Sequence, residues 1–452
     1  MNLDTTNMKT ILSPGRVSLS AFVSVAIAVV QLSALAQTFD SGSNGSDGAL
    51  DFTAFAPAQG APEVVVTFDP GDPKTFDHPT TPKADRRLDA DGDNTYHFTA
   101  VTIPAGVVVR LSAGVLGSRP VVWLASGDIT IAGKIDLNGS PGADAVEATA
   151  PALAGAGGYG GGHGGTVGVA PATRGSGPGG GLSGPSMGGG GAGHAVAAGG
   201  TEGGVAYGNP FLLPLWGGSG GAAGIVRSRR GGGGGAGGGA LLLASSSLIA
   251  VGGAVAADGG RGGASDPSTI FAGGAGGGGS GGAIRLIANR ITGNGSLSAQ
   301  GGAGGGSRDG TLQGFPGAAG RLRLEVFFRS FTGSILGAAS FGSAPGPVVL
   351  PANAPMVRVQ SIAGTTVAAD PRGNPSVADV SISEPTQASI VVEAQSVPVG
   401  TVVSLTIDSD SGARQTIQST ALEGTLAKST ATAAAAFPAG VSRIYLSASW
   451  PP

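Results

Sequence analysis

Three short apolar segments in the middle of the chain share one pattern of hydrophobic and polar positions. They are VVWLASGDITIAGKIDLNG at 121–139, ALLLASSSLIAVGGAVAADG at 240–259 and AIRLIANRITGNGSLSAQG at 283–301. Each has an apolar strand, an alanine, a polar turn, a second apolar strand, a small turn and a third apolar pair. The alternation of apolar and polar residues with a period of two is that of a β-strand. The recurrence of the pattern predicts a repeat fold, in which short strands stack in successive turns of a coil.

Alignment of the three segments on their alanines gives a specific expectation about register. Ala125, Ala244 and Ala288 should occupy equivalent positions in successive or near-successive turns. The second segment then carries one extra residue near Gly252–Gly253, which a β-bulge would accommodate. The segment GRLRLEVFF at 320–328 is expected to add a fourth strand to the set.

Glycine-rich tracts such as GGGGGAGGG at 231–239 separate the apolar segments. One interpretation is flexible coil, because glycine loses the most conformational entropy when it becomes ordered. The other is extended, polyglycine II-like strands with three residues per turn, which pack closely where no Cβ intervenes. The run YGNPFLLPLWGG at 207–218 is too apolar for a solvated linker and favours the packed alternative. We therefore expect long polyglycine-like insertions in a glycine-rich parallel β-helix, a solenoid, over residues 113–341.

The residues before the repeats, 37–112, are expected to form an N-terminal β cap on the first coil. Apolar runs at 63–68, 95–98 and 107–111 have the composition of strands, and the last two flank a Pro-Ala-Gly turn. An uncovered strand edge would pair with other chains, so a cap at this place has a physical purpose.

The composition changes after residue 341. Ser343-Ala344-Pro345-Gly346-Pro347 marks a linker, expected over 342–355, and glycine becomes scarcer from 356 onward. Short alternating segments then recur every 8–12 residues, which is typical of a small immunoglobulin-like β-sandwich at 356–452. The expected strands are Val357–Ile362, Ala378–Ile382, Ile390–Ala394, Val402–Ile407, Gln415–Ser419, Ser429–Ala434 and Arg443–Ala448. The fold class expected for the whole chain is all-β.

The first 36 residues have the features of a secretory signal peptide. Lys9 and Arg16 precede an apolar stretch, and Ala34-Leu35-Ala36 is a small-x-small cleavage site that makes Gln37 the expected mature start. An uncleaved membrane anchor is the alternative. Cleavage would leave no transmembrane span and would place the protein outside the cytoplasm, either secreted, at the cell surface or in a periplasm.

Composition and charge exclude several kinds of chemistry. Only 12% of the 452 residues are charged and the net charge is −3, which disfavours nucleic-acid binding because that requires a basic face. There are no cysteines, so disulfides, thiolate nucleophiles and cysteine-ligated metals are impossible.

One loop has the composition of a calcium site. DADGDN places Asp89, Asp91 and Asp93 at alternate positions, and calcium prefers several such oxygen ligands. Asp47 or Asp51 could add further ligands. The loop departs from the EF-hand pattern, with glycine at its fourth position and alanine at its twelfth. A solvated turn before a strand is therefore the alternative. No cofactor is expected, and calcium at this loop is the one candidate.

Serine-hydrolase and glycan-cleaving chemistry have weak support in the sequence. The pattern GxSxG occurs at 184–188, 217–221 and 278–282, but it requires a strand-to-helix turn that nothing here predicts. Cleavage of a glycan requires clustered carboxylates, and acidic residues are scarce in the repeat region. The positions of Asp128, Asp136, Glu202 and Asp258 in the fold would decide the question. The one basic cluster, Arg227-Ser228-Arg229-Arg230, could bind an acidic polysaccharide.

The chain resembles secreted bacterial glycine-rich right-handed β-helix proteins. The resemblance is carried by FDSGSNGSDGALD at 39–51, the run at 89–111, the first apolar segment and GGGGSGGAIRLIA at 276–288. It implies a fold and export, and it implies almost nothing about a ligand. The expected function is that of a non-enzymatic structural or adhesive protein, with surface polysaccharide or other cell-surface proteins as partners. The alternative is a carbohydrate-binding or carbohydrate-cleaving β-helix protein.

Overall fold

A computed structural model of the chain describes residues 38–72, 88, 92–145, 150–164, 172–183, 188–226, 230–266, 273–307, 310, 312–349, 353–368, 378–383, 387–409, 414–440 and 442–451. They belong to one compact unit, which begins at Thr38. The expected signal peptide lies outside the described residues, as do Asp89 and Asp91 of the expected calcium loop.

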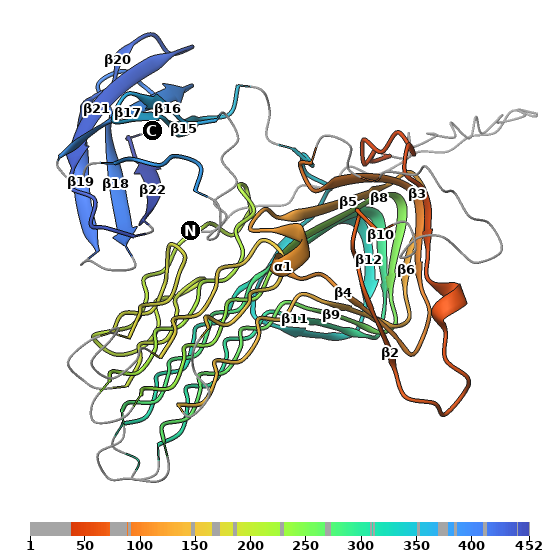
Figure 1. Cartoon of the computed structure of the whole chain (residues 1–452). Coiled ribbons are helices and arrows are strands. Elements are labelled where there is room, and N and C mark those ends of the chain that lie inside the picture. The colour runs from red at the N-terminus through yellow and green to blue at the C-terminus, as the bar shows by residue number, and fades with distance from the viewer. Residues whose placement is uncertain are drawn as a thin grey trace, which may run out of the picture. The chain divides into compact units, whose positions relative to one another are not determined.

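The described residues are nearly all β, which confirms the predicted all-β class (Figure 1). The exceptions are a 3-10 turn at Thr53–Phe55 and the helix α1 (Ala113–Leu116). Ser112 begins α1 by accepting a hydrogen bond from the N–H of Gly114, as N-cap residues do. Gly117 ends the helix at a φ of 76°, which glycine adopts without strain. Within the ranges given above, no helix is long and apolar enough to cross a membrane.

Two parallel sheets make up the first part of the molecule. The first consists, in spatial order, of β1 (Gly48–Asp51), β3 (Thr95–Ile103), β5 (Val121–Ala125) with β6 (Ile129–Ile131), β8 (Ala240–Val251), β10 (Ala283–Gly293), β12 (Arg321–Phe331) and β14 (Ala338–Gly342). The second consists of β2 (Val64–Thr67), β4 (Val107–Arg110), β7 (Lys134–Asp136), β9 (Ala254–Ala256), β11 (Ser296–Ser298) and β13 (Ser334–Leu336). Along the chain, strands of the first sheet alternate with strands of the second sheet. We call the first-sheet strand or strands together with the second-sheet strand that follows a rung. The strands of the lead-in thus belong to the same sheets as the repeats.

Side chains from both sheets pack into one hydrophobic cluster. Val121, Trp123, Leu241 and Leu243 enter it from the first sheet, and Val255 enters it from the second. The residues that alternate with them on the first sheet point to the opposite face. There Leu124, Leu242, Ala244 and Ile287 form a smaller cluster with parts of Phe39, Val122, Leu215 and Val348. Apolar residues on both faces explain why β8 and β10 have nearly continuous apolar runs.

The three repeated segments stack as successive rungs, as predicted, but the equivalence assigned to Ala244 is wrong. Ala125 and Ala288 both pair with Ser245, whereas Ala244 pairs with Leu124. Ala125 and Ala288 belong to the main core, while Ala244 faces the other way. A slip of one residue exchanges the two faces of a strand, so the buried face fixes the register and overrides the match between alanines.

The extra residue expected near Gly252–Gly253 is also misplaced. The first two segments keep a constant register through all three of their strand pairs, so nothing is inserted there. The irregularity lies between Ala288 and Arg290, where Asn289 stands opposite Ser246–Ser247. At this irregularity in the pairing of β8 and β10, the Asn289 amide donates a hydrogen bond to the Ser246 carbonyl at 2.6 Å. The predicted fourth strand is confirmed, since β12 pairs with β10 along its length.

The glycine tracts are hydrogen-bonded to one another with a period of three. Every third N–H from Gly233 to Gly239 donates to the segment 137–143. Every third N–H from Gly234 to Ala240 donates to the segment 156–162. Every third N–H from Gly232 to Gly238 donates to the segment 274–280, and all these bonds are 2.7–3.0 Å long. The N–H groups of successive residues thus donate to three different neighbouring tracts of the same chain, as in a threefold extended helix and unlike a β-strand. We call these packed tracts, the described parts of 138–239, 257–282 and 299–320, the glycine layer.

Close approach between backbones makes glycine necessary at many positions in this layer. An ideal Cβ on Gly235 would lie 1.9 Å from the Gly260 oxygen. On Gly305 it would lie 2.0 Å from the Gly263 oxygen, whereas on the next residue, Gly306, it would meet nothing within 4 Å. The requirement for glycine therefore changes from one residue to the next.

The C-terminal part contains two antiparallel sheets with a shared core. One consists of β16 (Thr365–Thr366), β15 (Met356–Ile362), β17 (Ala388–Gln395), β21 (Ser429–Ala435) and β20 (Glu423–Gly424), and the other of β19 (Gln415–Ala421), β18 (Val402–Ser409) and β22 (Ser442–Ala448). Six of the seven predicted strands are present. The exception is Ala378–Ile382, which has no strand structure.

Candidate functional site

A group of polar side chains lies within the glycine layer and at its border with β12. It consists of His194, Tyr207, Ser219, Ser280 and Arg321, which we call the polar cluster. His194, Ser219 and Ser280 have no solvent-exposed surface. Because the tracts around them consist mainly of glycine, few other side chains are available to fill the same space.

His194 is held by one hydrogen bond and one ring contact. Its Nδ1 lies 2.7 Å from the carbonyl oxygen of Gly281. Since a carbonyl can only accept, Nδ1 carries the proton and Nε2 has the lone pair. The imidazole stacks on the Tyr207 ring, with centroids 4.6 Å apart and planes inclined by 14°. Nε2 has no hydrogen-bond partner among the described residues.

Tyr207 and the two serines connect separate glycine tracts. The Tyr207 hydroxyl donates to the Gly217 carbonyl at 2.5 Å and accepts from Ser219 Oγ at 3.0 Å. Ser219 Oγ also accepts from the N–H of Gly179 at 3.0 Å. The N–H of Ser219 donates to Ser280 Oγ at 2.8 Å. Each hydroxyl therefore links glycine tracts that have no side chains of their own to pack against one another.

Arg321 closes the cluster at the start of β12. One terminal nitrogen of its guanidinium donates to the carbonyls of Ala195 and Tyr207, at 3.2 and 3.1 Å. An ideal Cβ on Gly208 would lie 3.7 Å from Arg321 Nε and 3.9 Å from His194 Nε2, so both atoms border one small space. The positive charge of Arg321 thus lies near the unpartnered nitrogen of His194.

Burial determines the protonation states in the cluster. Desolvation lowers the pKa of His194 to about 4, the bond to Gly281 opposes this change, and the charge of Arg321 adds to it. Desolvation also raises the pKa of Tyr207. At neutral pH both rings are uncharged, and the imidazole has no solvent-exposed surface. The geometry fits a buried cross-link within the layer.

The cluster unites residues that sequence patterns kept apart. Ser219 and Ser280 are the central serines of two of the three GxSxG patterns, and the third lies largely outside the described residues. No strand-to-helix turn surrounds either one. In the two described patterns the serines lie on neighbouring tracts and are hydrogen-bonded to each other. The signal that could have revealed the cluster is the presence of polar residues within tracts otherwise made of glycine and alanine.

The acidic residues that would distinguish a glycan-cleaving enzyme make separate local contacts. Asp136 on β7 pairs with Arg110 at 3.0 Å and with Lys134 at 3.6 Å. Asp258, after β9, accepts from the N–H of Gln300 at 2.7 Å. Asp128 lies between β5 and β6, and Glu202 is buried in the glycine layer, where it accepts from the hydroxyl of Thr201. Across the described residues, no group of three or more Asp, Glu, His or Cys side chains could hold a metal ion.

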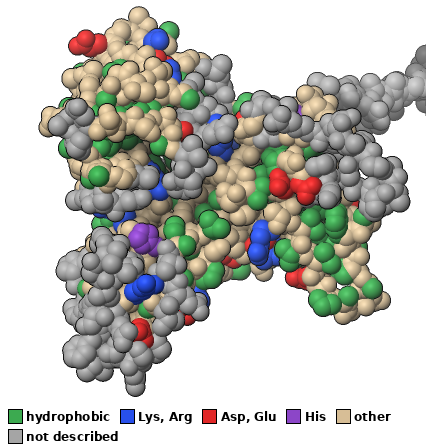
Figure 2. Space-filling view, viewed as in Figure 1, with side chains coloured by type: hydrophobic (Ala, Val, Ile, Leu, Met, Phe, Trp, Pro, Cys, Tyr) green, Lys and Arg blue, Asp and Glu red, His purple; other side chains and the backbone are tan. Residues whose placement is uncertain are grey.

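The part of the calcium loop that is described forms a turn. Asp93 accepts a hydrogen bond from the N–H of Thr95 at 2.7 Å, as an Asx-turn does. Asp47 accepts from the N–H of His97 at 2.6 Å, and Asp51 accepts from Thr53. Calcium binding by this loop stays a prediction. On the face shown in Figure 2, charged side chains occur in small scattered groups.

A buried ion pair lies on the outer face of the first sheet. Arg285 on β10 donates to Glu325 on β12 through Nε at 3.1 Å and through a terminal nitrogen at 3.0 Å. Their side chains are 1% and 3% exposed. Glu325 also accepts from the N–H of Gly346, and Arg285 donates to the carbonyl of Pro347. Burial lowers the pKa of Arg285, and the charge of Glu325 opposes this change. The pair thus fastens the segment after β14 to the sheet.

Comparisons with known proteins give no relative for this architecture. No family model matches the chain, and neither a curated protein nor a solved structure matches it. The resemblance noted from the sequence therefore stays a prediction.

The buried imidazole predicts a specific loss of stability in acid. Its pKa of about 4 lies below the value of 6.5 in an unfolded chain. Between these values the unfolded state takes up a proton that the folded state does not, so stability is complete above pH 6.5 and decreases as the pH falls to 4. The loss should be on the order of 2–3 kcal/mol.

Urea unfolding at a series of pH values measures this slope. His194→Phe should keep the ring stack and lose this part of the slope. Ser280→Ala removes a bond in the same cluster without removing the titrating group, so it should lower stability and keep the slope. Equal slopes in wild type and His194→Phe would refute the assignment to His194.

Proposed function

We propose that the protein is a secreted, non-enzymatic structural or adhesive protein of the cell surface or extracellular matrix. In this proposal the two parallel sheets form a glycine-rich β-helix, the glycine layer is polyglycine II-like, and the C-terminal sheets form an immunoglobulin-like sandwich. The observation that carries the proposal is the glycine layer itself. Its shape is determined by backbone hydrogen bonds and by close contacts that a Cβ would break, as suits a part whose purpose is a fixed form.

The polar cluster supports the same role. Its hydroxyls, imidazole and guanidinium make contacts between tracts, and the buried ones face no solvent. We infer that surface polysaccharide or other cell-surface proteins are the partners. Export follows in this proposal from cleavage before Gln37, and N-terminal sequencing of exported protein tests it. A membrane-bound chain that retains residues 1–36 would contradict it.

An attachment assay tests the structural or adhesive role. Producing cells that lack the protein should attach less to a solid surface or to one another, and purified protein starting at Gln37 should restore attachment. Protein with Gly306→Ala, where the added Cβ meets open space, should restore it equally. Protein with Gly235→Ala, which disrupts the layer, should fail to restore it.

The same preparations distinguish the alternative of a carbohydrate-cleaving protein. Release of reducing ends from cell-surface polysaccharides by the purified protein, together with unchanged attachment in cells that lack it, would overturn the proposal. Binding to those polysaccharides without cleavage would instead identify the partner.

A further inference from the structure

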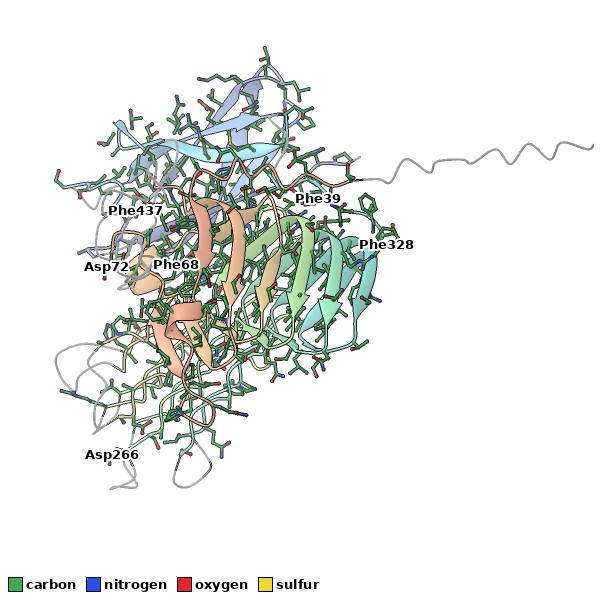
Figure 3. All side chains as sticks on the ribbon, turned by 90° about the vertical axis from the view of Figure 1, so that its right-hand side faces the viewer. Phe39, Phe68, Asp72, Asp266, Phe328 and Phe437 are labelled. Atoms are coloured by element: carbon green, nitrogen blue, oxygen red, sulfur yellow. The ribbon has the colours of Figure 1, made fainter. Side chains whose placement is uncertain are left out.

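The first described residues, 38–43, lie across the first sheet, and we call them the strap. In Figure 3 the ribbon that carries Phe39 crosses the stacked strands. Its hydrogen bonds reach one residue on each of four strands, β10, β8, β5 and β3, namely Asn289, Ser246, Ala125 and Phe98. These strands are neighbours in the sheet, so one short segment ties four rungs together.

Alternate side chains of the strap point to the sheet, as they do in an extended strand. Phe39 packs against the smaller apolar cluster on the outer face of the sheet. Ser41 is 1% exposed, and its hydroxyl donates to the Ala125 carbonyl at 2.8 Å. The Ser43 hydroxyl donates to the Phe98 carbonyl at 2.7 Å. The sheet thus contacts an aromatic ring and the hydroxyl groups two and four positions after it.

Side chains of the sheet hold the backbone of the strap. Asn289 accepts from the N–H of Phe39 at 2.7 Å and donates to its carbonyl at 3.3 Å. Ser246 accepts from the N–H of Ser41 at 2.9 Å. Among the described residues, no backbone-to-backbone hydrogen bond joins the strap to the sheet. Because each single bond contributes little net free energy, the strap should open while the rungs stay folded.

The strap can close only late in folding. The N–H of Phe39 is bonded to a side chain that lies 250 positions further along the chain. The surface that holds the strap is therefore incomplete until β10 has joined the sheet. A segment that docks on a completed surface behaves toward it as a ligand does.

We propose that the strap is detachable, and that the surface beneath it is a binding site for an extended peptide with the pattern Phe-x-Ser-x-Ser. This strap site consists of the smaller apolar cluster, the side chains of Ser246 and Asn289, and the carbonyl groups of Ala125 and Phe98. Its occupant in the folded protein is the strap of the same chain, and a separate peptide of the same pattern competes with it. The inference does not depend on the proposed function.

Hydrogen exchange in the full mature chain tests whether the strap detaches. The amides of Phe39 and Ser41 should exchange at least about tenfold faster than the paired amides of β8 and β10, and more slowly than in a free peptide. Ser246→Ala removes the acceptor for Ser41 and should make this exchange faster still. Ser247→Ala is the matched control, because this exposed hydroxyl has no hydrogen bond to the strap among the described residues.

A peptide of residues 38–43 tests the strap site in an NMR titration, which detects weak binding. The full-length double variant Phe39→Ala with Ser41→Ala weakens the strap and leaves the strap site unchanged. This variant should bind the peptide at least about tenfold more tightly than the wild type, in which the tethered strap competes. Adding Ser246→Ala to the double variant should weaken binding at least about threefold. Adding Ser247→Ala should leave binding unchanged.

Three results would overturn the proposal. The first is exchange of the strap amides at the rate of the β8 and β10 amides, which would make the strap an integral part of the sheet, or at the rate of a free peptide. The second is a folded double variant, checked by thermal melting, that binds the peptide no better than the wild type does. The third is equal binding of a peptide in which alanine replaces the phenylalanine and both serines, which would show that the pattern is not recognised.

Discussion

Gly235→Ala should lower the free energy of unfolding by about 3 kcal/mol or more, because the new methyl group has no space. Its Cβ would lie 1.9 Å from the oxygen and 2.5 Å from the carbon of the Gly260 carbonyl. Both atoms belong to backbone that is itself hydrogen-bonded, so the conflict can be relieved only by separating two tracts. Urea unfolding of the mature protein measures the loss, and limited proteolysis should show faster cleavage within 151–239.

Alanine substitutions at two other glycines are the controls for this measurement. Gly306→Ala should change stability by less than about 0.5 kcal/mol, since its Cβ meets open space. At Gly233 the nearest atom to a new Cβ is 3.2 Å away, so the same replacement should have an intermediate effect. If Gly235→Ala unfolds like the wild type, the tracts do not pack as closely as described.

Glu325→Leu should cost about 3–5 kcal/mol, because it leaves Arg285 charged and buried without its carboxylate. Arg285 has an exposed side-chain fraction of 1%, so water cannot replace the lost partner. The N–H of Gly346 loses its acceptor as well. Equilibrium unfolding in urea gives the size of the effect.

The double variant Arg285→Met with Glu325→Leu is the control for that experiment. It removes both charges and fills the same volume with apolar atoms, so most of the stability should return. A double variant no more stable than the single one would show that the loss comes from packing, from Gly346 or from Arg323, whose guanidinium also pairs with Glu325, and not from the unpaired charge of Arg285.

The strands were predictable because their apolar side chains carry the signal. The run at 240–251 and its two relatives gave the order of rungs, and GRLRLEVFF gave the next one. The lead-in strands at 64–67 and 107–110 also lie where the apolar runs placed them. The register was harder to predict. Ala244 and Ala125 are both alanines, yet they lie on opposite faces of the first sheet. The larger apolar residues beside each alanine decide which face of its strand packs into the main core.

Contacts within the glycine layer could not be predicted from the sequence. A glycine carries no side chain whose polarity would indicate its neighbour, so nothing in 231–239 specifies 137–143 over any other tract. The polar cluster has the same origin. His194 and Ser280 are 86 positions apart in the chain, by subtraction of their numbers, and only the packing of the tracts brings them together.

The three-residue period of the glycine layer constrains how these tracts can change in length. In a β-strand, inserting two residues restores the original face to every later position. In the tract at 233–239, successive N–H groups donate to three different tracts of the same chain. Only insertions or deletions of three residues therefore return each later N–H to the tract that accepts its hydrogen bond. Changes of one or two residues would turn the rest of the tract by a third or two thirds of a turn. Length variants of this layer should therefore tolerate whole triplets and no other step.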